Sequence, residues 1–384
     1  MTNFVQLYKS TDLNAPTLSG VVGSLVTLLN KCLVDGYTTA SVTLTQTGNV
    51  ATATTVANTF VTGNYVTISG ANEVDYNGTF QITVLNPTTF TFPVANSPAS
   101  PATGTILYAK AGLGWSRPYT GTNAATYRSL DVTSNQFYLQ INDNGATPGA
   151  GREAQAWGCE LMTSYGGYGF RPFPNVATLG SGLSLRKSST ADATLRAWTL
   201  IGDDRTFYLI MGPTGDSCLY HLHAFGHFLP FRTKDGYCTF IDGEGTFNSA
   251  AAGNNLCTSY SNSYSSLYLA RNYAGLASTP PGVSPITLPY VNASNLVFGA
   301  TAGMAAPNGP DTGYYVMPVY IYESSTFRGR FPGLYHPMQA NPLVNYDTMT
   351  NVAGLSGVTL TAVTITNTSA AIGTMLFDTF GPWT

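Results

Sequence analysis

The chain has 384 residues, which is long enough for two or three domains with a sizeable core. Only 9% of its residues are charged, against about 25% in an average soluble protein, and Thr, Ser, Asn and Gly supply the polarity instead. Its 16 basic and 19 acidic side chains leave a net charge of -3, so the surface offers no field for gripping a phosphate backbone and nucleic-acid binding is disfavoured.

Targeting and membrane signals are missing from the sequence pattern. Residues 1–9 lack the basic segment and apolar run of a secretory signal, and no stretch approaches the roughly 20 apolar residues of a membrane span. We therefore expect a protein made in the cytoplasm without a membrane span. The cysteines are odd in number, far apart and without a C-x-x-C pair, which predicts buried thiols.

The first element that the sequence predicts is a helix. After an extended arm that ends at Pro16, apolar residues recur at helical spacing, with Ser19 as the N-cap and Gly36 as the C-terminal stop. These apolar residues are Val21, Val22, Leu25, Leu28, Leu29, Cys32 and Leu33. The stripe predicts an amphipathic helix that packs on a sheet formed by later sequence. We assign residues 1–38 to the framework of the protein.

Residues 39–108 have the clearest pattern in the chain. Between Ser41 and Ile106, apolar residues alternate with polar ones at the spacing of half-buried strands. These apolar residues are Val42, Leu44, Val66, Ile68, Phe80, Ile82, Val84, Phe90 and Phe92. Turn residues separate the runs, which predicts roughly five or six short strands in an inserted small β module. An insertion of this kind implies that Tyr37 and Ala109 lie close together in space.

Residues 109–384 predict a larger β framework of sandwich or barrel type. Strands are expected at 137–141, 156–161, 197–201, 206–211, 218–226, 296–298, 313–322, 358–366 and 374–380. The clearest pair is the hairpin from Ala197 to Met211, where a Gly-Asp-Asp-Arg turn joins two runs rich in aromatic and β-branched residues. The sequence therefore predicts a mainly β protein with one N-terminal amphipathic helix and an inserted small all-β module.

Three histidines form the one spacing typical of a metal site. His221 and His223 would point to the same face of a strand, where two imidazoles could share a metal completed by His227 or by the turn from Asp242 to Glu244. Alternatively, the imidazoles stack on neighbouring aromatic side chains in a sheet. We keep the three histidines as metal candidates and expect no cofactor.

Catalytic constellations are not evident. Acidic residues such as Asp203, Asp204 and Asp378 lie in Gly- or Thr-rich turns, where Asp caps its own backbone. The sequence has no nucleophile elbow, phosphate-binding loop or dinucleotide-binding fingerprint. We therefore expect a protein that is not an enzyme.

Two stretches predict contacts with other molecules. Residues 255–273 are dense in Tyr, Ser and Asn, the composition of recognition loops, and an alternative is a loop buried against a sister subunit. Further along, two arginines stand among turn formers, where Arg330 could bond backbone carbonyls or the pair could reach a carboxylate of another subunit. The candidate interaction residues are Tyr260, Tyr264, Tyr268, Tyr273, Arg328 and Arg330.

Several segments resemble structural proteins of tailed bacteriophages. The segments 63–70, 76–80 and 88–92 are similar to a small β module that recurs in such proteins. Gly114-Trp115-Ser116-Arg117-Pro118-Tyr119 and Arg328-Gly329-Arg330-Phe331-Pro332-Gly333-Leu334-Tyr335 look like parts of a family of phage virion proteins of collar, neck or tail accessory type. The resemblance implies a virion structural protein and carries no catalytic residues.

The expected function is that of a structural component of a tailed phage virion. A surface so poor in charge repels like copies weakly, which suits a symmetric homo-oligomer in the neck, collar or tail that also contacts other virion proteins. The alternatives are a protein that binds a host-surface glycan and a capsid decoration protein. A capsule depolymerase would show parallel β-helix repeats and a pair of acids in a cleft, and the sequence has neither pattern.

Overall fold

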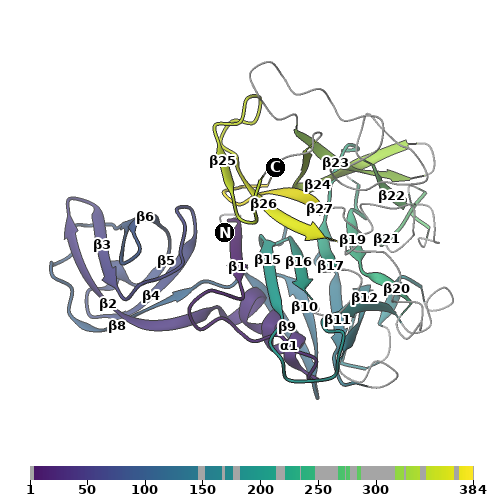
Figure 1. Ribbon diagram of the computed structural model, residues 1–384, viewed down its shortest axis with the longest axis horizontal. Coiled ribbons are helices and arrows are strands. Elements are labelled where there is room, and N and C mark those ends of the chain that lie inside the picture. Colours follow the sequence, from purple (N-terminus) through teal and green to yellow (C-terminus); the bar gives the residue numbers. More distant parts are fainter. Residues whose placement is uncertain are drawn as a thin grey trace.

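The computed structural model describes residues 4–145, 152–166, 169–175, 182–212, 221–233, 235–246, 267–272, 274–276, 283–286, 316–323, 326–337, 343–366 and 372–383. These residues are mainly β, in antiparallel sheets, with a short helix near the N-terminus, which confirms the predicted fold class. Figure 1 shows a small β module on one side of a larger body.

The module is a seven-stranded sheet that curls around its own core. Its strands are β2 (Tyr37–Thr47), β3 (Val50–Thr55), β4 (Tyr65–Ala71), β5 (Gly78–Gln81), β6 (Thr83–Asn86), β7 (Thr89–Pro93) and β8 (Gly104–Lys110), in the order β5-β4-β8-β2-β3-β7-β6. All nine alternating apolar residues named above belong to the core or pack against it, as the period-2 pattern predicts. The rings of Phe80 on β5 and Phe92 on β7 lie 4.7 Å apart, so the two ends of the sheet approach each other.

The junction of the module with the body lies where the sequence places it. Tyr37 at the start of β2 pairs with Lys110 at the end of β8, which confirms that Tyr37 and Ala109 are neighbours in space. The paired strands run somewhat beyond the predicted bounds of 39–108.

The centre of the body is a sheet that is buried on both faces. It consists of β1 (Gln6–Lys9), β15 (Ala197–Gly202), β16 (Thr206–Gly212), β17 (His221–His227), β19 (Thr239–Asp242) and β21 (Leu267–Leu269) in that order. The predicted hairpin is confirmed, because Ala197 pairs with Gly212 and Gly202 with Phe207. Every residue of β16 is buried, since other sheets cover both sides.

One face of this central sheet packs on a second sheet, which we call the helix-side sheet. It contains β9 (Trp115–Gly121), β10 (Ala124–Ser129), β11 (Tyr138–Asn142), β12 (Glu153–Leu161), β13 (Phe170–Phe173), β14 (Leu183–Arg186) and β20 (Glu244–Thr246). Leu200, Leu209 and Phe225 of the central sheet share a core with Leu139 and Ile141 of the helix-side sheet.

The other face packs on a third sheet, which we call the C-terminal sheet. Its strands are β18 (Leu229–Pro230), β22 (Val283–Ile286), β23 (Val316–Glu323), β24 (Thr326–Pro337), β25 (Thr348–Thr350), β26 (Thr359–Thr366) and β27 (Ile372–Asp378). Ile201, Tyr208 and Ile210 share a second core with Ile321 and Phe377. The framework is thus a β-sandwich of three layers.

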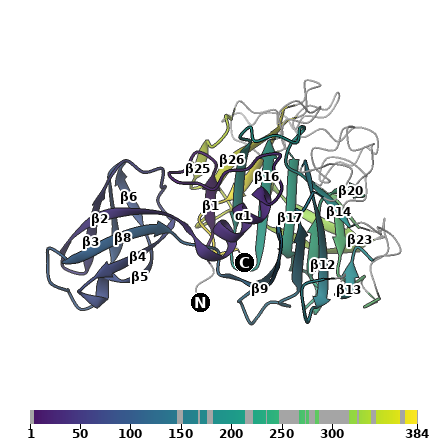
Figure 2. The ribbon, with the colours of Figure 1, turned by 90° about the horizontal axis from the view of Figure 1, so that it is seen from below.

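The predicted helix forms, but it is shorter than expected and starts differently. Helix α1 (Ser24–Leu29) continues into a π-helical turn (Asn30–Asp35) that stops at Gly36, whose φ of 72° confirms the predicted end. Ser19 is not the N-cap. Instead, the backbone N–H of Leu25 donates to the carboxylate of Asp143 at 3.0 Å, a capping partner supplied by a distant loop. Figure 2 shows α1 and β1 on the side of the body that faces the module.

Two further expectations concern the thiols and the membrane. Cys32, Cys159 and Cys238 are free and buried, as predicted, and the remaining two cysteines lie outside the described residues. Among the described residues, no helix has the length and apolar character needed to cross a bilayer.

Candidate functional site

The C-terminal sheet is hollowed at a bulge in β24. Pro318 pairs with Tyr335 and Tyr320 pairs with Arg330, so the single residue Val319 lies opposite the four residues 331–334. The extra residues push β24 away from β23 and leave Arg330 and Tyr335 on the two sides of the bulge.

Proline and glycine residues make the bulge possible. Pro332 has no N–H to donate to the ladder, and its carbonyl accepts a hydrogen bond of 2.8 Å from the hydroxyl of Tyr208. Gly333 has a φ of 60°, and a Cβ there would lie 2.1 Å from Nε1 of Trp383. The segment Arg330-Phe331-Pro332-Gly333 therefore has a structural role, because it lets the chain leave the sheet and pack on the ring of Trp383.

The hollow beside the bulge has a volume of about 310 Å³. Its polar lining residues are Arg330, Tyr335, Ser356 and Asp378, and the segment 356–358 forms one rim. Apolar lining comes from Leu229, Pro318, Phe331, Val358, Phe380 and Trp383. We call this feature the β24 hollow. It combines an apolar wall with a few charged and hydroxyl groups, as sites for small ligands do.

The charged groups of the β24 hollow influence one another. Burial raises the pKa of Asp378, although its Oδ1 accepts hydrogen bonds from the backbone N–H groups of Thr359 at 3.2 Å and Phe380 at 3.0 Å. Burial also raises the pKa of Tyr335, the positive charge of Arg330 opposes this shift, and the charge of Asp378 adds to it. The phenol thus lies within the fields of a cation and an anion.

Arg328, two residues before Arg330, is not a surface residue. It is 1% exposed, and its guanidinium contacts Asp235 at 2.9 Å and Glu323 at 2.8 Å within the same chain. It also donates to the backbone carbonyl of Arg271 and lies 5.5 Å from the ring centre of Phe228. The predicted ion pair with another subunit therefore does not hold for Arg328, because its carboxylate partners come from its own fold. Arg330, in contrast, is half-buried and lines the β24 hollow.

The tyrosine-rich stretch is described only in part. Tyr268 lies in β21, pairs with Ile241 and is 3% exposed. It is therefore a core residue, and the prediction that it contacts another molecule is wrong. Tyr260, Tyr264 and Tyr273 lie outside the described residues.

The histidines of β17 divide into a pair and a single residue. The rings of His221 and His223 are nearly parallel, with centres 6.3 Å apart, which confirms that they share a face. Burial lowers the pKa of both imidazoles, that of His223 to about 3, so both are neutral at neutral pH. His227 does not join them, because its Nε2 accepts a hydrogen bond of 2.7 Å from the backbone N–H of Asn135. The described residues contain no group of three His, Cys, Asp or Glu that could hold a metal ion.

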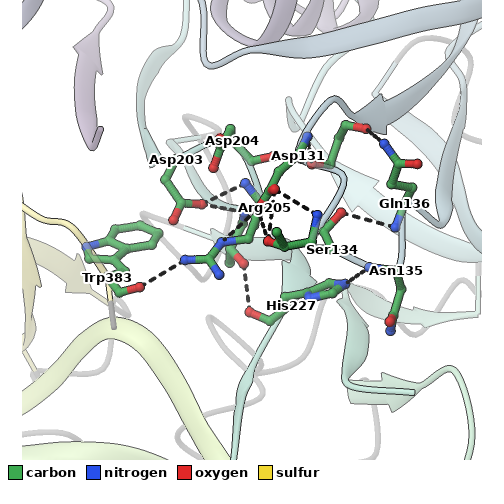
Figure 3. Close-up of polar contacts among 12 residues, drawn as sticks. Asp131, Ser134, Asn135, Gln136, Asp203, Asp204, Arg205, His227 and Trp383 are labelled. Atoms are coloured by element: carbon green, nitrogen blue, oxygen red, sulfur yellow. Dashed lines mark hydrogen bonds and ion pairs between the residues drawn. The ribbon is translucent and has the colours of Figure 1, made fainter. Parts of the chain in front are cut away.

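His227 instead belongs to a polar cluster around the turn between β15 and β16 (Figure 3). The Oδ1 atom of Asp203 accepts the backbone N–H groups of Arg205 at 2.8 Å and Thr206 at 2.7 Å, so this Asp caps its own turn as predicted. The side chain of Arg205 lies 3.6 Å from Asp131. It also donates a hydrogen bond of 3.1 Å to the backbone carbonyl of Trp383.

Two carboxyl groups of this cluster, those of Asp203 and Asp204, have raised pKa values. Burial raises the pKa of Asp203 to about 7, against the opposing hydrogen bond and charge of Arg205, and the charge of Asp204 adds to the shift. Burial raises the pKa of Asp204 to about 6, helped by Asp131. Neither residue lines the β24 hollow, and both are at most 8% exposed. The arrangement fastens a turn of the central sheet to the C-terminal segment and leaves a substrate little access.

Sequence reasoning singled out Arg330 but missed Tyr335 and Asp378 as its neighbours. Tyr335 lies only five residues further on, and the Pro-Gly pair between them is the signal of a bulge that would have brought the two together. Asp378 comes from another strand, and no local pattern indicates that it lines the same hollow as Arg330.

Comparisons with known proteins leave the function to be argued from these residues. No protein-family model matches the chain. No curated protein matches it either.

Proposed function

We propose that this chain is a non-enzymatic structural protein of a tailed bacteriophage particle, made in the host cytoplasm and incorporated into the virion. In this proposal it forms a symmetric homo-oligomer in the neck, collar or tail region and contacts other virion proteins. The observation that carries the proposal is a small β module held firmly on one side of a charge-poor, three-layered β body (Figures 1 and 2). Such a shape suits a subunit whose body packs in a ring while the module reaches a neighbour.

A buried polar cluster holds the module to the body, and we call it the neck cluster. Asp12 accepts hydrogen bonds from Lys110 Nζ at 2.7 Å, from the Tyr37 hydroxyl at 2.7 Å and from the Thr59 hydroxyl at 2.8 Å. Lys110 and Asp12 have side chains only 1% and 2% exposed. Burial alone would raise the pKa of Asp12, but the charge and hydrogen bond of Lys110 and the bond from Tyr37 lower it. Asp12 is therefore ionised and paired at neutral pH.

A second contact fixes the module from the edge of the central sheet. The side-chain amide of Gln6 donates to the carbonyl of Tyr65 at 2.7 Å and accepts from the N–H of Tyr65 at 2.8 Å. The ring of Phe4 stacks on that of Tyr65, with centres 3.9 Å apart. Contacts on both sides of the junction favour a module with a fixed orientation relative to the body. A subunit needs such a fixed orientation if its module contacts a neighbour in a symmetric assembly.

The proposal is tested by the assembly state and by location. Sedimentation velocity of the purified full chain should show a discrete oligomer, in which each contact buries at least about 1,000 Å². Electron microscopy of phage particles that carry a labelled copy should place the label in the neck, collar or tail. A single copy at high concentration, together with absence from mature particles, would contradict the proposal; a label on the capsid surface would favour the capsid decoration alternative.

A second candidate function is binding to a host-surface glycan. The observation that favours it is the β24 hollow, in which a cation, a carboxylate and a phenol meet an apolar wall. Carbohydrates present both hydroxyl groups and apolar C–H faces, so they need such a mixed surface.

A further inference from the structure

We infer that the β24 hollow binds a neutral pyranose unit of a glycan, with Arg330, Tyr335 and Asp378 as its polar contacts. The inference rests on the second candidate function and gives it a site and a class of sugar. In this inference the glycan contacts the β24 hollow and not the tyrosine-rich stretch.

The size and access of the hollow suit one small ligand. Its volume of about 310 Å³ falls at the lower end of the range for ligand sites, roughly 300–1,000 Å³. Ser356, Gly357 and Phe380 on its rim are exposed, so a ligand can enter from solvent. The bulge that forms it is fixed by Pro332 and Gly333, which means that the hollow exists before a ligand arrives.

The charges select a neutral ligand over a charged one. The guanidinium of Arg330 only donates hydrogen bonds, the carboxyl group of Asp378 supplies oxygen acceptors, and the hydroxyl of Tyr335 both donates and accepts. An anionic sugar would be attracted by Arg330 but repelled by Asp378, and the reverse holds for a cationic sugar. A neutral sugar carries hydroxyl groups that donate and accept, so it satisfies both partners without a like-charge contact.

The apolar wall suits the other side of a pyranose ring. Phe380 is 38% exposed although it is aromatic, and it borders the hollow together with Val358 and Pro382. An exposed ring of this kind gives contact area to the C–H face of a sugar at little entropic cost. Phe380 also approaches the module, because a Cβ at Gly63 would lie 3.0 Å from its ring. A glycan held here would thus lie close to the base of the module.

Saturation-transfer NMR on the full chain tests the inference. The probes are the methyl glycosides of glucose, galactose and mannose at millimolar concentration, with glucuronate and glucosamine as charged comparisons. Ser356→Trp should plug the hollow from its exposed rim, and Ala353→Trp is the matched control, because residue 353 is exposed in the same segment and does not line the hollow. Arg330→Gln removes the cation, and Arg117→Gln makes the same change at a residue on β9 outside the hollow.

We expect saturation transfer to at least one neutral glycoside in the unmodified chain and in both controls. The signal should vanish in Ser356→Trp, and the affinity should fall about tenfold or more in Arg330→Gln, because a charge-assisted hydrogen bond is lost. No transfer to any neutral glycoside, an unchanged signal in Ser356→Trp, or stronger transfer to a charged sugar would overturn the inference.

Sedimentation tests the assembly proposal independently of glycoside binding. If the unmodified chain sediments as an oligomer, binds no glycoside and becomes a single copy in Ser356→Trp, the hollow belongs to a contact between copies; the inference then fails and the assembly proposal stands. If the chain sediments as a single copy at high concentration and is absent from mature particles but binds a neutral glycoside, the inference stands and the assembly proposal fails.

Discussion

Replacing Asp12 by Ala tests whether the neck cluster joins the module to the body. The substitution removes the acceptor for Lys110, Tyr37 and Thr59 together. Lys110 remains in place, 1% exposed, without the carboxylate that balances its charge. The damage therefore exceeds the loss of a few hydrogen bonds, because a buried ammonium group has to be accommodated or exposed.

The size of the effect follows from the burial of the pair. Breaking a buried ion pair by removing one partner costs about 3–5 kcal/mol, because the remaining charge is uncompensated. Removing both charges avoids most of this cost, so the double variant Asp12→Ala/Lys110→Met should be at least about 2 kcal/mol more stable than Asp12→Ala alone. The exposed pair of Lys31 and Asp35 lies 3.8 Å apart and serves as the control. Asp35→Ala should cost less than about 1 kcal/mol.

Urea unfolding followed by two probes gives the measurement. All four tryptophans lie in the body, at positions 115, 157, 198 and 383, so their fluorescence reports on the body alone, whereas far-UV circular dichroism also reports on the module. We expect coincident transitions in the unmodified chain and separated transitions in Asp12→Ala, because the coupling between the two parts is lost. Coincident transitions and a loss of less than about 1 kcal/mol in Asp12→Ala would refute the role assigned to the neck cluster.

Three further changes have defined outcomes. Burial raises the pKa of Asp203 to about 7, above the value near 3.9 of an unfolded chain, so the stability of the fold falls as the pH rises from about 4 to about 7 and levels off above that. Asp203→Asn should therefore stabilise the protein by at least about 1 kcal/mol more at pH 8 than at pH 5 in urea unfolding, and equal gains would contradict this reasoning. Gly333→Ala should cost about 3 kcal/mol or more and shift the fluorescence of Trp383, because it combines a φ of 60° with a clash, whereas Gly354→Ala, at a φ of 80° in open space, should cost about 1–2 kcal/mol. Arg328→Met leaves two buried carboxylates without their cation and should lower the midpoint of thermal unfolding by an amount that corresponds to about 3–5 kcal/mol; a change within about 0.5 kcal/mol would show that the pairs contribute little.

Local patterns were sufficient wherever one face of an element is buried and the chain reverses within a few residues. The module is the best example, because each alternating apolar residue from Val42 to Phe92 belongs to its core or packs on it. The hairpin from Ala197 to Met211 was equally predictable, since its turn and both strands are contiguous in sequence. The end of the helix at Gly36 could also be predicted, because the residue that ends a helix often has a positive φ, which favours glycine.

Long-range partners decide the features that the sequence does not reveal. The capping carboxylate of α1 comes from Asp143, which lies 118 residues from Leu25, so Ser19 was the better local candidate and still the wrong one. Strand β24 escaped prediction because its Gly and Pro residues indicate turns, whereas the structure uses them for a bulge inside a long strand. Arg328 seemed an exposed contact for the same reason.

The location of the buried charges explains how so few charged residues can specify this fold. Asp12 pairs with Lys110 across 98 residues, Lys187 with Asp143 across 44, and Arg328 with a carboxylate 93 residues away. Each pair joins segments that belong to different sheets or loops, and each is nearly inaccessible to solvent. Apolar contacts between flat sheets tolerate small rotations and slips, whereas a buried charge tolerates no position without its partner. These pairs therefore fix how the sheets and the module are set against one another, and the symmetric assembly that we propose requires the same arrangement in every copy.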